Sequence, residues 1–111
     1  MNRVLKAMVL FFVLTGINWQ AVAFSEADLQ KLKSSLKCPK CDLAGADLSG
    51  VILAGANLNS ANLNKARFFR AELVGANLTE ADLSGVDLGF ADLTGADLSG
   101  TNLIDAYMED T

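Results

Sequence analysis

The feature that most constrains this chain is a five-residue repeat that runs without a break from residue 41 to residue 110. A typical unit is Ala46-Asp47-Leu48-Ser49-Gly50, in which a small residue and an Asp or Asn precede a leucine at position i. Fourteen units follow one another, and position i is Leu in all of them except at Phe68 and Met108. A run of this regularity predicts a repeat architecture in which each unit packs on its neighbours.

A period of five fits neither an α-helix nor a flat strand. Five residues advance a helix by about 500°, so the leucines would not share one face. On a flat strand, an odd repeat would send successive leucines to opposite faces. The small residue at i−2 and the apolar residue at i lie two apart, and the next small residue follows three further on. Both can face inward on every unit only if the chain turns a corner once per unit. The Gly, Ser and Asp at i+2 suit such a turn. Four corners close a square coil of twenty residues, and stacked coils pair at about 4.8 Å.

The Ala-(Asp/Asn)-Leu-X-X text of residues 46–50 and its neighbours resembles the pentapeptide-repeat family. Members of that family form right-handed quadrilateral β-helices, so the resemblance implies an all-β solenoid of this kind. The fourteen units of residues 41–110 would build about 3.5 coils. The resemblance brings no catalytic residue, cofactor or metal site, and we expect none.

The first residues read as a targeting segment rather than as part of the solenoid. Arg3 and Lys6 form a basic start, residues 7–17 are apolar, and Ala21-Val22-Ala23 is a small-x-small cleavage signal. Residues 1–23 are therefore predicted to be a secretory signal peptide, because the apolar run is well short of the roughly 20 residues of a membrane span. We expect an exported protein (periplasm, cell exterior or organelle lumen) with no membrane contact after cleavage. A retained anchor is the alternative.

Net charge argues against a nucleic-acid partner. Beyond residue 23 the chain has 7 basic and 13 acidic residues, whereas nucleic-acid binders carry the opposite sign. The sequence contains no histidine, the commonest general base and metal ligand.

Residues 24–40 are predicted to form an N-terminal capping helix and a junction. Ser25 is the expected N-cap, with Asp28 at N3 as an acidic analogue of the capping box. A helix from about Glu26 to Leu36 would present an apolar stripe to the first coil. The members of that stripe are Leu29, Leu32 and Leu36.

The junction contains Cys38-Pro39-Lys40-Cys41, which holds both cysteines of the chain. In an exported protein the default expectation is a structural disulfide. A C-P-x-C pair also occurs in thiol-disulfide oxidoreductases, but there it usually opens a helix within a βαβ unit. Free or intermolecular thiols are a third interpretation, and a zinc site would need two further ligands.

A twenty-residue coil predicts which side chains stack. Asp47, Arg67 and Asp87 fall in one outward column at i−1, where Arg67 would separate two carboxylates as a structural ladder worth about 0–1 kcal/mol. Phe68 becomes a larger core residue. Of the other i−1 columns, one alternates Asp with Asn and one has Asn before Asp, and we expect amides to donate between carboxylates there. The three columns are Asp42, Asn62, Asp82, Asn102; Asn57, Asn77, Asp97; and Ile52, Glu72, Asp92.

Four residues near this ladder are less easily explained as scaffold. Phe69, Arg70, Phe90 and Tyr107 bring outward aromatics and a cation to one face, with Arg70 and Phe90 close enough for a cation–π contact. Exposed aromatic patches often mark partner sites, so these residues are the candidate partner surface. The competing interpretation is that they only pack on each other or under the N-terminal segment.

The leading functional hypothesis is a non-enzymatic, exported module that presents a rigid surface to an unknown protein partner. One alternative is a DNA-mimicking inhibitor, which the resemblance implies for some acidic members; another is an oxidoreductase that uses the two cysteines. Near Tyr107 and Ile104 the last coil would expose apolar residues and a strand edge. A homodimer through this C-terminal end is therefore a further expectation.

Overall fold

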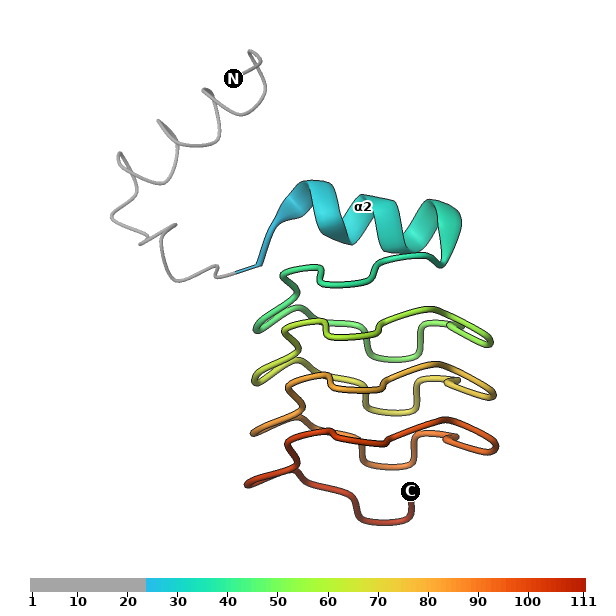
Figure 1. The fold of residues 1–111 in the computed structure, drawn as a ribbon. Helices are drawn as coiled ribbons and strands as arrows, with labels where there is room; N and C mark the ends of the chain where they lie inside the picture. The colour runs from blue at the N-terminus through green and yellow to red at the C-terminus, as the bar shows by residue number, and fades with distance from the viewer. Residues whose placement is uncertain (1–23) are drawn as a thin grey trace, which may run out of the picture.

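The computed structural model describes residues 24–111, and the predicted signal peptide, residues 1–23, lies outside the described residues. Helix α2 (Glu26–Ser35) lies across one end of a stack of coils, and the C-terminus lies at the opposite end (Figure 1). In the part of the chain that the structure describes, no helix is both long and apolar enough to cross a membrane.

The coils pair through parallel bridges between residues twenty apart. The series runs from Lys37 with Asn57 to Asp87 with Tyr107, one bridge for each unit. The predicted register is therefore confirmed. Between residues 24 and 111 each side of a coil contributes a single bridging residue rather than a longer strand. Other residues of the unit also bond between coils: the N–H of Leu48 donates to the Arg67 carbonyl at 2.7 Å and that of Gly50 to the Phe69 carbonyl at 2.9 Å.

Each corner is a turn with its third residue in the left-handed region. At the first such corner of the repeats, the N–H of Ala46 donates to the carbonyl of Leu43 at 3.0 Å, and Gly45 has φ 75°. A positive φ at this place defines a type II turn and favours glycine. Non-glycine residues take the same conformation at other corners, among them Arg70 (φ 60°) and Phe90 (φ 57°).

The Asp or Asn at i−1 serves its own turn. The N–H of Asn59 donates to Oδ1 of Asn57 at 3.1 Å, and the N–H of Ser99 donates to Oδ1 of Asp97 at 3.0 Å. This local bond explains why both residue types fit the position, and it corrects the expectation that these amides donate along their own column. Side-chain bonds between coils come from i+1 instead: Nδ2 of Asn59 donates to Oγ1 of Thr79 at 2.6 Å.

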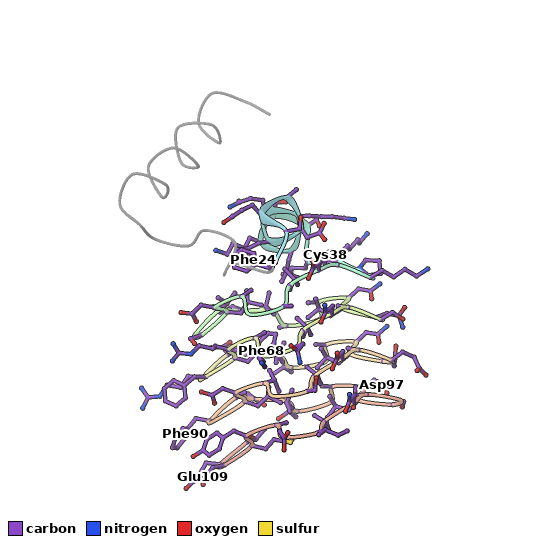
Figure 2. The ribbon with its side chains drawn as sticks, turned by 90° about the vertical axis from the view of Figure 1, so that its left-hand side faces the viewer. Phe24, Cys38, Phe68, Phe90, Asp97 and Glu109 are labelled. Atoms are coloured by element: carbon purple, nitrogen blue, oxygen red, sulfur yellow. A yellow bond between two sulfur atoms is a disulfide. The ribbon has the colours of Figure 1, made fainter. Side chains whose placement is uncertain are left out.

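The interior is a column of close-packed apolar side chains. Phe68 (Figure 2) replaces one leucine there and is fully buried. It is in register with the buried Leu48 and Leu88. The small residues at i−2 are buried beside them as far as Ala91, except for the partly buried Val51. Toward the C-terminal end the leucines become only partly buried, as at Leu98.

Helix α2 begins as predicted but its acidic residue acts differently. Ser25 is the N-cap and accepts from the N–H of Asp28 at 3.2 Å. The Asp28 carboxylate does not return to Ser25; it accepts from the N–H of Asp42 at 2.8 Å and so joins the helix to the first coil. Ser25 donates its own N–H to the Asp42 carbonyl at 2.9 Å. Leu29 and Leu32 are buried against the core.

The cysteine motif is itself a turn of the solenoid. Cys38 and Cys41 form a disulfide, and the N–H of Cys41 donates to the carbonyl of Cys38 at 3.3 Å. Pro39 and Lys40 (φ 60°) occupy the two middle places, as Pro favours in a type II turn. The bridged register thus begins at Lys37, with Cys38 in a leucine position, and the disulfide closes the turn from inside the core.

Candidate functional site

The predicted partner surface gathers on one side of the stack. Figure 2 shows Phe90 projecting from one edge, with Glu109 below it, while Asp97 lies at the opposite edge. Phe90 and Tyr107 remain 51% and 50% exposed. Phe69 is half-buried beside them and Arg70 is exposed.

Three of these side chains contact one another directly. The rings of Phe69 and Phe90 meet edge to face, with centroids 5.7 Å apart and planes at 84°. The guanidinium carbon of Arg70 lies 5.3 Å from the Phe69 centroid and 5.8 Å from that of Phe90. The predicted cation–π contact between Arg70 and Phe90 is therefore confirmed. The competing interpretation is also partly right, because the rings pack on each other while half of Phe90 stays in solvent.

Gly89 lies at the centre of this group, and the sequence reasoning missed it. A Cβ on Gly89 would lie 3.1 Å from Cε1 of Tyr107 and 3.2 Å from Cδ2 of Phe69. Its φ lies outside the left-handed region that the corner glycines adopt, so the space, and not the backbone conformation, accounts for the glycine. One signal was available: Gly89 is the only glycine of the repeats at i+1 rather than i+2.

We call Phe69, Arg70, Gly89, Phe90 and Tyr107 the aromatic surface. Tyr107 is held in it by its hydroxyl, which donates to the Glu109 carboxylate. This hydrogen bond raises the pKa of Tyr107 above its ordinary value, because ionising the phenol would break it. Chemically, the surface offers ring faces, ring edges and one guanidinium.

The predicted ladder has the expected register, with Asp47 bridged to Arg67 and Arg67 to Asp87. The pKa of Asp47 is lowered first by the hydroxyl and N–H of Ser49 and only then by the charge of Arg67. The N–H contact, at 3.1 Å, is the firmer of the two, because the buried Ser49 hydroxyl does not reach hydrogen-bond geometry. The ionised Asp47 carboxylate is thus stabilised mainly by its own turn and only slightly by the charge of Arg67.

The family follows from the repeat itself. The model of pentapeptide repeats matches residues 41–73 and 71–110, with eight copies. The chain belongs to the pentapeptide-repeat family. That family implies a right-handed β-helix solenoid, in agreement with the register described above. Among curated proteins none matches this chain.

Solved structures of other pentapeptide-repeat proteins resemble it. Rfr23 from the cyanobacterium Cyanothece 51142 is 34% identical with a TM-score of 0.45, over 66% of this chain and 47% of that one. A protein of the Arabidopsis thaliana thylakoid lumen is 33% identical with a TM-score of 0.36, over 69% of this chain and 54% of that one. HetL of Nostoc, described as involved in heterocyst differentiation regulation, is 36% identical with a TM-score of 0.33, over 64% and 38%. This chain therefore spans about half of their length or less.

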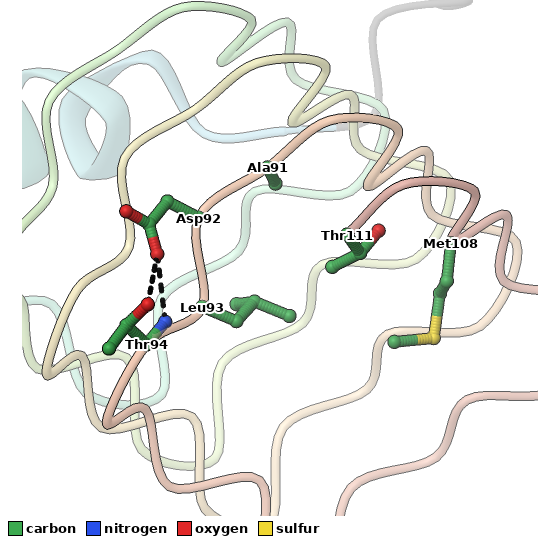
Figure 3. Close-up of a pocket in the computed structure, with 6 residues that line it drawn as sticks. All are labelled: Ala91, Asp92, Leu93, Thr94, Met108 and Thr111. Carbon is green, nitrogen blue, oxygen red and sulfur yellow. Dashed lines mark hydrogen bonds between the residues drawn. The ribbon is translucent and has the colours of Figure 1, made fainter.

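The last coil of this pentapeptide-repeat chain carries an open hollow of about 440 Å³ (Figure 3). Leu93 and Met108 line it, with Thr111 near them and the hydrogen-bonded pair of Asp92 and Thr94 at one rim. The expected homodimer through this end stays a prediction, which sedimentation at high micromolar concentration would test.

No group of three or more His, Cys, Asp or Glu residues within residues 24–111 has the arrangement of a metal site. The two cysteines are buried in the first turn of the solenoid and face its core. The aromatic surface is the candidate site.

Proposed function

We propose that this chain is an exported, non-enzymatic pentapeptide-repeat module that binds a protein partner through the aromatic surface. The proposal includes the finer architecture: a right-handed quadrilateral β-helix of about 3.5 coils over residues 41–110, capped at one end by residues 24–40. It also includes a signal peptide, residues 1–23, removed before Phe24.

The observation that carries the proposal is the exposure of the Phe90 side chain at a corner of the solenoid. This side chain is 51% exposed and stands at a corner with φ 57°, where glycine is favoured. The left-handed φ belongs to the turn itself, since Ser60 and Glu80 adopt it at other corners. What distinguishes Phe90 is a large aromatic ring left half in solvent, and exposed aromatic groups often mark partner sites. A partner that covers Phe90 and Tyr107 gives this arrangement a purpose that folding alone does not.

The two alternative functions have less support. An oxidoreductase needs an accessible sulfur, whereas Cys38 and Cys41 are both buried. A DNA mimic needs a continuous acidic face, whereas Lys65, Arg67 and Arg70 interrupt the acidic repeats. Catalysis by a histidine is excluded because the sequence has none.

Crosslinking in the native compartment tests the proposed surface. The double variant Phe69→Ser, Phe90→Ser should lose a protein that the wild type captures. The matched control is Ile52→Ser, Val74→Ser, which removes two other exposed apolar side chains and should keep it. The surface is the wrong one if both double variants fold and capture the same proteins as the wild type.

Mass spectrometry of the purified protein tests export separately. We expect the mature chain to begin at Phe24. A product that retains residues 1–23 in the cytoplasm would contradict export and would return the DNA-mimic hypothesis to consideration.

A further inference from the structure

The positive charges of residues 41–111 are confined to one place. Between residues 41 and 111 the chain has 11 acidic residues but only three basic ones, Lys65, Arg67 and Arg70. All three are exposed. They lie within six residues of one another, Arg70 within the aromatic surface and the other two near it in the sequence, so this face combines apolar rings with the three cations of an otherwise acidic stretch, residues 41–111.

The side chain of Arg70 packs against two aromatic rings, and its N–H groups remain available to bind a ligand. The rings of Phe69 and Phe90 lie 5.3 and 5.8 Å from its guanidinium carbon and provide no conventional acceptor for its N–H groups. Among residues 24–111, Arg70 donates no side-chain hydrogen bond. A guanidinium held in this way matches a carboxylate, which can accept two parallel N–H bonds from it.

The apolar part of the surface lies next to that charge. Because Gly89 has no Cβ, the rings of Phe69 and Tyr107 close over it, and Phe90 projects beside them with half its surface exposed. A ligand that places a carboxylate on Arg70 therefore brings its adjacent group against Phe90 and Tyr107. The matching ligand carries a carboxylate and, next to it, an aliphatic or aromatic group.

We propose that the aromatic surface binds an acidic peptide segment of a protein partner, with an Asp or Glu on Arg70 and a neighbouring apolar side chain on Phe90. This inference rests on the proposed function and specifies the chemistry of the partner. A polyanion fits less well, because Asp87 is bridged to Arg67 and both Asp87 and Asp110 lie near enough to Tyr107 to act on it electrostatically, so these carboxylates would repel successive phosphates. A single carboxylate on Arg70 meets less of that repulsion than a run of phosphates does.

Selection from a phage-displayed library of random dodecamers tests the inference. The target of the selection is the protein purified in the form that the cell produces. Enriched peptides should carry Asp or Glu within two residues of an apolar side chain. In titrations of one enriched peptide, changing its acidic residue to the amide, or Arg70→Gln in the protein, should each weaken binding about tenfold or more, the loss typical of one charge-assisted pair. The two changes together should weaken binding no further than either alone.

Three variants separate the parts of the site. Arg70→Lys keeps the charge but not the fork, so binding should be weakened less than by Arg70→Gln. Gly89→Ser restores the residue type common at i+1 and should weaken binding by displacing the rings, whereas Ala54→Ser, at the same repeat position on another face, should not. Circular dichroism should report an unchanged fold for all three.

Several outcomes overturn the inference: no enrichment, enrichment without acidic residues, peptide binding unaffected by Arg70→Gln, or tighter binding of oligo-dT than of any peptide. Its failure is distinguishable from that of the proposed function. If crosslinked partners are lost in Phe69→Ser, Phe90→Ser but retained in Arg70→Gln, the surface is right and the acidic chemistry is wrong. If both variants keep every partner, the surface itself is wrong.

Discussion

Truncating Phe68 measures how tightly the solenoid is packed. Its side chain is fully buried in the same column as Leu48 and Leu88, and the backbone bridges on either side of it fix the spacing between coils. The coils cannot move together to fill the space, so Phe68→Ala should leave a cavity. A buried Phe→Ala change costs about 3–5 kcal/mol, a large part of the roughly 5–15 kcal/mol that stabilises a domain.

Urea unfolding followed by circular dichroism measures this loss, with an unchanged m-value as the sign that only stability has altered. Phe68→Leu restores the residue that the repeat uses elsewhere and should cost less than about 1.5 kcal/mol. Leu98→Ala, in the partly buried last coils, should cost less than Phe68→Ala. A loss below about 1 kcal/mol for Phe68→Ala, or a larger one for Leu98→Ala, would refute the packing argument.

Three other predictions concern the N-terminal end and the carboxylates. Asp28→Ala leaves a backbone N–H of the first coil without its acceptor and should cost about 1–3 kcal/mol in urea unfolding, while Asp28→Asn, which keeps an oxygen, should recover much of that. Replacing both Cys38 and Cys41 with Ser should cost roughly 2 kcal/mol and raise hydrogen exchange in α2 first; equal exchange along the chain would contradict this. Hydrogen bonds from Thr94 and Ser99 lower the pKa values of Asp92 and Asp97. The stability that these ionised carboxylates contribute is therefore complete above the ordinary aspartate pKa of about 3.9 and is lost as pH falls through the lower folded values. The double change to Asn should flatten the acid limb of the stability–pH curve; an unchanged limb would contradict the assignment.

The register could be predicted from the sequence because the period permits few solutions. Five residues with one corner, repeated without a slip, place residue n beside n+20, and the pairing of Asp47 with Arg67 follows without further information. The contact between Arg70 and Phe90 follows in the same way, since they are twenty residues apart. The relative positions of residues in the unbroken repeat therefore follow from its period alone.

The sequence does not predict contacts that depend on the positions of individual atoms rather than on the register of the coils. Asp28 satisfies the pattern of a capping box, yet its carboxylate finds a backbone N–H of the first coil, which is visible only once the helix lies on that coil. The cysteine motif does not resemble a repeat, although Pro39 and a left-handed Lys40 make it a turn of the same type. Gly89 was overlooked because glycine is expected at turns, whereas here it provides space for two rings.

A Phe90→Gly variant separates the cost of the aromatic surface from its use. Glycine removes the left-handed penalty of about 1–2 kcal/mol, and the exchange forfeits contacts with Phe69 and Arg70 that are worth about 0.5–1.5 kcal/mol each. Because these terms oppose one another, the free energy of unfolding should fall by no more than about 2 kcal/mol, while partner capture should fail. If stability drops by more than about 2 kcal/mol, Phe90 holds the solenoid together, and its exposure no longer requires a partner. A folded, equally stable variant that captures nothing would instead mean that the chain keeps a strained aromatic corner for binding alone.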